Sequence, residues 1–271
     1  DGVDGRDSSL ANQRNTPIEK TEEAAAAKIT EYALRKDSGG PGEWRGGTGV
    51  VFSVRIAKDG SSVLGRGMER FVFRPWGIAG GKPGERARVV VNLGLPNEKE
   101  LGKLDIFNAE PGDIVTIMTP GGGGFGDPLK RPEEKVLEDV LFGYVSVESA
   151  LEDYGVVIQD GNIQKSRTRE MREKKRYLKS ENQIYNFGPE RDAWEQVFDD
   201  NNMCELNSLL MQLSTSARSK RRADVFYAVI PNLAKFSSSD LGSLIGDPKK
   251  AKSEFERQLD ALRSDVRELS G

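Results

Sequence analysis

The stretch "TPGGGGFGDPL", residues 119–129, marks the point where the character of the sequence changes. Four consecutive glycines, one aromatic residue and a fifth glycine are followed by Asp-Pro, a combination typical of a turn that ends one element and begins another. Of the 30 glycines in the 271-residue chain, 23 precede residue 130. We therefore expect a turn-rich half before this point and a different kind of structure after it.

Segments rich in β-branched residues and bounded by glycine or proline precede this boundary, a pattern typical of strands. Their short spacing leaves no room for crossover helices and favours an antiparallel sandwich or barrel-like sheet over a parallel one. A fifth segment, residues 21–35, could begin as a helix at Thr21 or enter the sheet as a strand. The four predicted strands are residues 49–56, 70–75, 86–94 and 113–119.

After residue 130 the apolar residues follow helical spacing. Val136, Val140 and Leu141 are expected on one helix face, and Cys204 is expected to be a small core residue of a later helix. A final amphipathic helix should bury Phe255, Leu259, Leu262 and Val266. The sequence thus predicts an α+β protein: a glycine-rich, mostly antiparallel β domain (1–130), a short helical segment (131–160) and a helical C-terminal extension (161–271).

The composition excludes several kinds of metal site and catalytic site. The chain has no histidine and one cysteine, so it cannot by itself supply the usual zinc, copper or non-haem iron ligands, nor a nucleophile paired with histidine. The net charge is −3, and the basic segments 166–179 and 218–222 carry no nucleic-acid motif, so they are interpreted as solvated helix faces or subunit contacts. No apolar run is long enough to span a bilayer and no secretory signal is seen, which favours a cytoplasmic protein without nucleic-acid or membrane partners.

The glycine run itself admits three interpretations. A Walker loop would need Gly-Lys-Ser/Thr where this run continues with Asp-Pro, and a dinucleotide fingerprint would have to open a helix directly. A strand-to-helix turn with close backbone approach fits better. Backbone N–H groups of the run could still cradle an anion or line a ligand pocket.

A second glycine-dense segment, "DSGGPGEWRGGTG" at residues 37–49, contains Arg45. This arginine could hold a carboxylate or phosphate, but an arginine that ties glycine turns together through carbonyl oxygens is commoner. Trp76, in the similar segment "RPWGIAGGKPG" (residues 74–84), is expected in the core rather than as a stacking platform.

Taken in order, several strings resemble the C-terminal part of the hydantoinase B/oxoprolinase family. The motifs that carry the resemblance are "DGVDGRDSSLANQRNTPIE", "LRKDSGGPGEWRGGTGVV", "RPWGIAGGKPG", "GDIVTIMTPGGGGFGDPL" and "VLEDVLFGYVSVESALEDYGVVI", spread over residues 1–158. The sequence after residue 160 is similar, through less diagnostic motifs, to a helical extension found on some members.

The resemblance implies a role in a hetero-oligomeric enzyme that uses ATP to activate a carbonyl by phosphorylation. The reaction would be hydrolytic opening of a cyclic amide (hydantoin, oxoproline or lactam) or carboxylation of a ketone such as acetone or acetophenone. Implied partners are a hydantoinase A-type subunit, the N-terminal part of the B-type subunit and a small-molecule substrate. ATP with Mg²⁺ and a divalent metal are implied for the whole complex, with none bound by this chain alone, since the family's metal ligands lie in the N-terminal half.

We therefore expect this chain to be the C-terminal portion of a B-type subunit, as a fragment or separate polypeptide, and inactive by itself. Catalytic residues are not identified, and a non-catalytic scaffold that holds the subunits together is the alternative. An independent nucleotide-binding protein is a third possibility that rests on the glycine run alone. Loops that could line the active cavity contain these candidate residues: Asp37, Arg45, Gly121, Gly122, Gly123, Gly124, Gly126 and Asp127.

Overall fold

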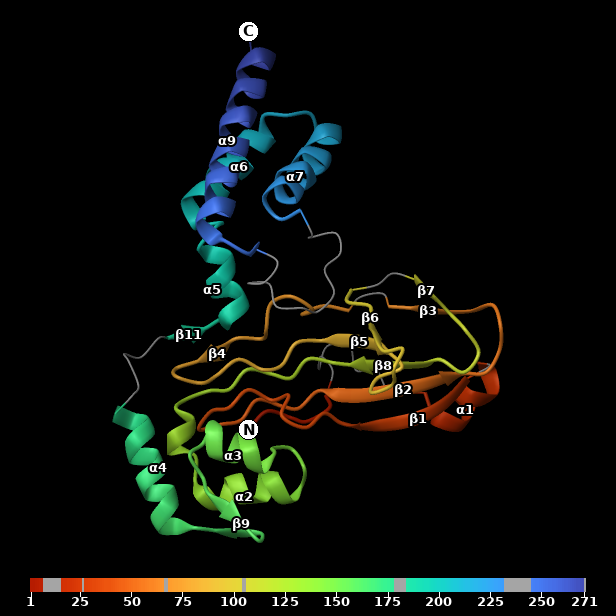
Figure 1. The fold of residues 1–271 in the computed structure, drawn as a ribbon, viewed down its shortest axis with the longest axis vertical. Helices are drawn as coiled ribbons and strands as arrows, with labels where there is room; N and C mark the ends of the chain where they lie inside the picture. Colours follow the sequence, from red (N-terminus) through yellow and green to blue (C-terminus); the bar gives the residue numbers. More distant parts are fainter. Residues whose placement is uncertain are drawn as a thin grey trace. The chain divides into compact units, whose positions relative to one another are not determined.

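The computed structural model of the chain describes residues 1–6, 16–25, 27–65, 68–103, 106–177, 184–231 and 245–270. It divides into two compact units, Asp1–Gly188 and Pro189–Gly271 (Figure 1). The boundary between these two units falls after Gly188. The division into residues 1–130, 131–160 and 161–271, which was expected from the composition, stays a prediction.

A five-stranded antiparallel sheet forms the centre of the first unit (Figure 1). Three of the four predicted strands are confirmed. The segment 21–35 combines its two alternatives: it ends helix α1 (Ile18–Ala24), which begins at Ile18 and not at the expected Thr21, and then continues as a strand. Within the described residues the sheet is open at both edges and forms no closed barrel, so the α+β class is confirmed. In spatial order the strands are β1 (Ala27–Leu34), β2 (Val50–Ile56), β8 (Ile114–Met118), β5 (Arg88–Val91) and β6 (Lys99–Glu100).

The predicted strand at residues 70–75 is wrong. Residues 71–73 form bends, and Arg70 has a φ of 65°, which is a left-handed conformation incompatible with a strand. The apolar pattern of this segment reflects burial instead, because Phe71 is 3% exposed and belongs to the core.

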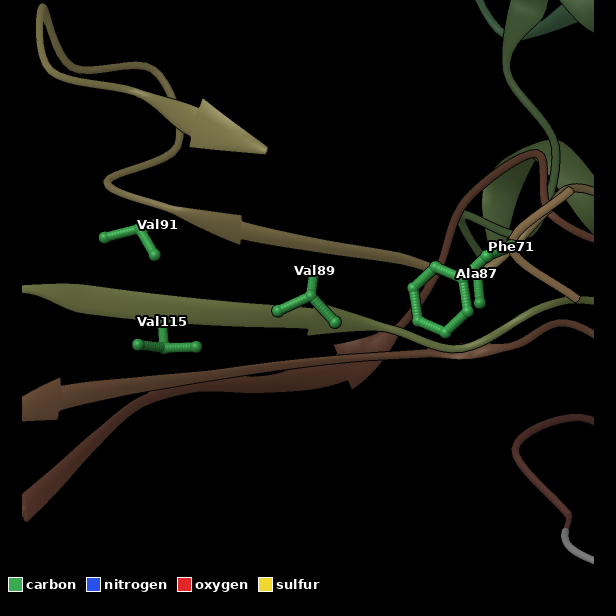
Figure 2. Packing of buried hydrophobic residues seen from close by; sticks show 5 residues of the cluster. All are labelled: Phe71, Ala87, Val89, Val91 and Val115. Carbon is green, nitrogen blue, oxygen red and sulfur yellow. The ribbon is translucent and has the colours of Figure 1, made fainter. Parts of the chain in front are cut away.

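One face of the sheet carries the main hydrophobic core. Strand register places Phe52 opposite Ile117, and Ile117 opposite Val89, so these side chains share a face. Beside them the antiparallel pair of β3 (Ser61–Leu64) and β7 (Ile106–Ala109) contributes partly buried apolar side chains. Burial of each such valine or phenylalanine stabilises the fold by roughly 1.5–3 kcal/mol. Figure 2 shows the buried members of this cluster: Phe71, Ala87, Val89, Val91 and Val115.

A group of short elements completes the first unit. A smaller core, which includes the fully buried Val136 and Tyr154, holds several of them together. The elements are β4 (Gly77–Ile78) paired with β11 (Tyr185–Asn186), the 3-10 helix η1 (Pro128–Lys130), α2 (Glu133–Leu141), α3 (Val147–Glu152), β9 (Ile158–Gln159) paired with β10 (Asn162–Ile163), and α4 (Lys165–Tyr177).

Helix α2 has acidic residues in its first turn, where they favour the helix dipole, but its buried face differs from the expected one. Val136 is buried and Val140 is half-buried, whereas Leu141 is 68% exposed, so its predicted place on the apolar face is wrong. At 100° per residue, Leu141 lies about 140° around the helix from Val136. Asp139, three residues after Val136, is buried instead.

The second unit is helical. The predicted stripe of α9 is confirmed, since Phe255, Leu259, Leu262 and Val266 are all buried. Cys204 is exposed, so its assignment to the core was wrong; α6 buries Leu206 and Leu210, and a residue two positions earlier faces the opposite side. None of the described helices combines the length and apolar character needed to cross a membrane. The helices are α5 (Pro189–Glu195), α6 (Asp200–Met211), α7 (Thr215–Val229) and α9 (Pro248–Ser270).

Candidate functional site

Three extended connections leave the same end of the central sheet and lie side by side (Figure 1). We call them the glycine loops: the first is residues 37–49, the second 74–85 and the third 119–127. Strand register explains why they meet, because Leu34 pairs with Val50, and Met118 pairs with both Val51 and Arg88. The sheet thus brings together most of the residues selected from the sequence.

Backbone hydrogen bonds join the three loops to one another. The second loop bonds directly to the first, and the third loop exchanges bonds with both. These bonds run from Gly40 N to Gly122 O (2.7 Å), from Gly122 N to Gly47 O (2.8 Å), from Ile78 N to Gly124 O (2.9 Å) and from Gly124 N to Lys82 O (3.0 Å).

The glycines of residues 121–124 are required by the closeness of these backbones. A Cβ on Gly123 would lie 1.8 Å from the carbonyl oxygen of Trp76, and one on Gly121 would lie 1.9 Å from that of Ser38. Gly124 is similar, whereas a Cβ on Gly122 would meet no described atom closer than 3.3 Å. The run therefore acts, within this chain, as a device for close backbone packing, in line with the strand-to-helix turn favoured by the sequence.

Arg45 occupies the interior of the first glycine loop and is 3% exposed. Its Nη1 and Nη2 donate to the two carboxylate oxygens of Asp4 at 2.9 and 3.1 Å, and Nη1 also donates to the carbonyl oxygen of Gly46 at 2.7 Å. Nε donates to Asp139 at 3.3 Å. Arg45 thus ties a glycine turn together, the commoner of its two predicted roles, with internal carboxylates in addition.

Arg131 forms the second half of the same buried network and is 1% exposed. Its Nη1 and Nη2 bind the carboxylate of Asp1 at 2.6 and 2.9 Å, and Nε and Nη2 donate to the second oxygen of Asp139 at 3.1 and 2.8 Å. Nη1 also donates to the carbonyl of Glu43 at 3.0 Å. Asp139 therefore bridges Arg45 and Arg131, and the α2 helix is fixed to the first glycine loop.

Burial and neighbouring charges shift the pKa values of Asp4 and Arg45 in opposite directions. Burial alone would raise the pKa of Asp4, but hydrogen bonds from Arg45 and the Thr48 amide, together with the Arg45 charge, hold that pKa below its ordinary value. Burial would lower the pKa of Arg45, yet the Asp4 hydrogen bond and the charges of Asp139 and Asp4 raise it. Burial raises the pKa of the neighbouring Tyr154, whose hydroxyl makes no hydrogen bond to a described residue. These pKa shifts favour a charged Asp4, a charged Arg45 and a neutral Tyr154 near neutral pH.

The remaining candidate residues stabilise junctions between elements. Asp37 has a φ of 57°, and its Oδ1 accepts the Ser146 N–H at 2.7 Å, which links the first loop to the start of α3. Asp127 caps η1 by accepting the Leu129 N–H at 3.0 Å. Gly126 has a φ of 75°, which favours glycine at the end of the run.

The described residues do not form a metal site. No group of three or more histidine, cysteine, aspartate or glutamate side chains lies within binding arrangement in the described ranges. Three carboxylates do gather around Arg45 and Arg131, but the arginine N–H groups occupy the carboxylate oxygens of Asp1, Asp4 and Asp139. The divalent metal implied by the resemblance therefore does not fit these residues.

Aromatic side chains lie exposed on the glycine loops. Trp76 is 42% exposed, so its expected place in the core was wrong; it contacts Phe187 edge-on at 5.6 Å between ring centroids, and Arg70 lies over its ring. Trp44 and Phe125 are also exposed and face each other through paired backbone hydrogen bonds.

Sequence reasoning missed the partners of Arg45. Asp1, Asp4, Arg131 and Asp139 are separated by long stretches of chain, and charged residues at such positions ordinarily face solvent. One signal was available: Asp139 lies three residues after Val136 on the helix face that must be buried.

Comparison with known proteins agrees with these motifs. The model of the hydantoinase B/oxoprolinase family matches residues 1–128, which include all three glycine loops. Residues 1–128 are thus similar to the hydantoinase B/oxoprolinase family, and the resemblance read from the sequence is confirmed.

Curated relatives extend the similarity beyond the third loop. A protein assigned as the B-type subunit of a D-/L-hydantoinase from Pseudomonas sp. (strain NS671) is 38% identical over 176 residues, which cover 64% of this chain and 29% of that protein. The β-subunit of caprolactamase from Pseudomonas jessenii is 39% identical over 151 residues, or 54% of this chain and 26% of that one. The chain therefore spans less than a third of the length of these relatives.

Two solved structures share the fold. The ATP-dependent caprolactamase from Pseudomonas jessenii is 34% identical with a TM-score of 0.50, covering 58% of this chain and 28% of that chain. A nucleotide-free acetone carboxylase is 21% identical with a TM-score of 0.51, covering 86% of this chain and 35% of that chain, and shows similarity of fold alone.

Proposed function

We propose that this chain is the C-terminal portion of a hydantoinase B-type subunit in an ATP-dependent enzyme of several subunits. The enzyme would activate a carbonyl by phosphorylation, either to open a cyclic amide such as a hydantoin, oxoproline or lactam, or to carboxylate a ketone of the acetone or acetophenone type. The observation that supports this most is the match of residues 1–128 to the family, together with relatives named as subunits of hydantoinase and caprolactamase.

Within that assembly the chain depends on partners for its chemistry. The partners would be a hydantoinase A-type subunit and the N-terminal part of the B-type subunit, which would supply the nucleotide site and the metal ligands. ATP with Mg²⁺ and the divalent metal belong to the whole complex, and a cytoplasmic location fits the use of ATP. Asp37, Asp127 and the glycines of the third loop remain our candidates for backbone and side chains close to the shared cavity.

A scaffold role is the second candidate, and a specific observation favours it. The glycines at positions 121, 123 and 124 face neighbouring backbone, and Arg45 is occupied by internal carboxylates. A module built in this way could hold subunits together without touching the substrate.

The test compares the 271-residue chain alone with the chain mixed with the two partner components. ATP hydrolysis would be measured with hydantoin, 5-oxoproline and caprolactam, and with acetone or acetophenone plus bicarbonate. We expect no substrate-dependent hydrolysis by the chain alone and hydrolysis with one substrate class in the mixture. Turnover by the chain alone would contradict the proposal.

The two candidate roles can be separated in the active mixture. Replacement of Asp37 or Asp127 by asparagine should lower kcat or raise KM if these residues line the cavity. Assembly measured by sedimentation serves as the control. Unchanged kinetics combined with weaker assembly would favour the scaffold.

A further inference from the structure

A cavity of about 670 Å³ lies in the first unit, apart from the Arg45 and Arg131 network. Its floor is the face of β1 and β2 that carries Ile29, Tyr32 and Phe52, and its opposite wall includes Ile18 of α1 and Met68. The rings of Tyr32 and Phe52 meet edge-on at 5.5 Å between centroids. A cavity of this size, with an apolar floor, is suited to a small organic molecule.

The cavity continues the hydrophobic core along the same sheet face. Tyr32 pairs with Phe52, Phe52 with Ile117, and Ile117 with Val89, so the apolar floor and the core shown in Figure 2 form one surface. Beside β5 this surface is covered by Phe71 and the paired strands β3 and β7. Beside β1 and β2 it borders the cavity instead, which leaves Tyr32 45% exposed.

Two guanidinium groups stand at the rim. Arg6 and Arg70 line the cavity, and neither forms an ion pair with a described carboxylate. Glu69 also lines it, but its charge is offset by Lys103 at 2.8 Å. The local charge at the rim is therefore positive, which favours an anionic ligand.

Arg70 is held in position despite an unfavourable backbone. Its φ of 65° is uncommon for a residue with a side chain, and such strain persists only where surrounding contacts impose it. Its carbonyl oxygen accepts the Ala87 N–H at 3.0 Å, and its guanidinium lies 5.2 Å from the centre of the Trp76 ring. The charge is thus kept at the mouth of the cavity while its remaining N–H groups can still donate.

Two threonines of the glycine loops also line the cavity. Thr48 lines the cavity, and its buried hydroxyl lies beside the Asp4 carboxylate without making a well-formed hydrogen bond to a described residue. The Thr119 hydroxyl, by contrast, already accepts the Val50 N–H at 2.7 Å. The proposed site therefore relies on its arginines, and not on these hydroxyls, for polar contact with a ligand.

The geometry points to a binding site for a small carboxylate that carries an apolar aliphatic or aromatic body. The body would pack on Ile29, Tyr32 and Phe52, and the carboxylate would pair with Arg70 at the rim. All residues of this site belong to the chain itself, and binding requires neither ATP nor a partner protein. The test of this site is therefore independent of the proposed function.

Calorimetric titration of the 271-residue chain with 4-phenylbutyrate tests the site, with 4-phenylbutan-1-ol as the neutral counterpart. We expect saturable binding of the acid, weaker binding of the alcohol, and loss of acid affinity as salt concentration rises. Arg70→Gln should weaken binding of the acid about tenfold, the loss of one charge-assisted contact. Arg55→Gln, which removes an exposed arginine of β2 that does not line the cavity, should leave it unchanged.

Val50→Phe, which adds volume to a half-buried cavity residue, should abolish binding while the circular dichroism spectrum stays that of the parent chain. If this variant does not fold, the comparison of Arg70→Gln with Arg55→Gln decides whether the acid binds in this cavity. The proposal is overturned if the acid does not bind at millimolar concentration, if acid and alcohol bind equally, if both arginine variants behave alike, or if folded Val50→Phe binds normally.

Discussion

The carbonyl oxygen of Trp76 occupies the space that a side chain on Gly123 would need, only 1.8 Å from the ideal Cβ position. Both residues lie in glycine loops that are joined by backbone hydrogen bonds, so neither can move without breaking several of them. The relationship gives the glycine run a physical role that can be tested one residue at a time.

Gly123→Ala should destabilise the first unit by about 3 kcal/mol, because the added methyl group overpacks a site where the obstacle is backbone. Gly122→Ala is the matched control in the same run, since its Cβ would lie 3.3 Å from the nearest described atom. It should cost about 1 kcal/mol or less. Urea unfolding monitored by circular dichroism measures both, and equal losses would contradict the packing interpretation.

Asp139→Asn should destabilise the first unit by about 3–5 kcal/mol, because it leaves the buried guanidinium groups of Arg45 and Arg131 with a neutral bridge. Glu23→Gln, which removes the exposed pair with Lys20, should change stability by less than about 1 kcal/mol. Thermal unfolding of the three proteins provides the comparison. A loss in Asp139→Asn no larger than that in Glu23→Gln would show that the bridge contributes little.

The lowered pKa of Asp4 predicts a specific acid sensitivity. Because the folded-state pKa lies below the ordinary 3.8, Asp4 contributes stability that is complete above that value and is lost as pH falls through the folded-state pKa. Asp4→Asn should be less stable near neutral pH and should lose stability less steeply between about pH 4 and pH 2. The free energy of unfolding measured against pH tests this.

Asp59→Asn provides the control for the acid experiment, since Asp59 is an exposed carboxylate in the turn between β2 and β3. Its unfolding curve should keep the steepness of the parent chain. If Asp4→Asn and the parent chain decline in parallel, Asp4 is not the group responsible.

Cys204 should react readily in the native protein, because its side chain is exposed on α6. We expect labelling by a thiol-specific disulfide reagent at close to the rate seen in denaturant, and no loss of stability in Cys204→Ser. Strong protection in the native state would instead support the core position first expected from the sequence.

Sequence reasoning succeeded where the structural cause is local. The strands at β2, β5 and β8 follow from β-branched residues between turn residues, and the stripe of α9 follows from helical spacing. It failed at residues 70–75, where an apolar pattern and a left-handed Arg70 occur together. The left-handed backbone of Arg70 prevents a strand there, and no pattern in the sequence predicts that conformation.

In the candidate site, too, the features with a local cause could be predicted and the others could not. The glycine density and Arg45 could be found from the sequence, because tight turns require those residues. The identity of the Arg45 partners could not, since Asp4 and Asp139 come from distant segments that only the folded sheet brings together. The cavity was missed as well, because its floor and its rim arise from four separate stretches of chain.

The hydrogen bonds between the glycine loops also have a consequence for how the chain folds. They connect residues as distant as Gly40 and Gly122, and the run of glycines has no apolar side chains that could condense early. Ordering glycine also costs more conformational entropy than ordering other residues, and distant contacts form slowly. We therefore expect the loops to close only after the sheet has formed.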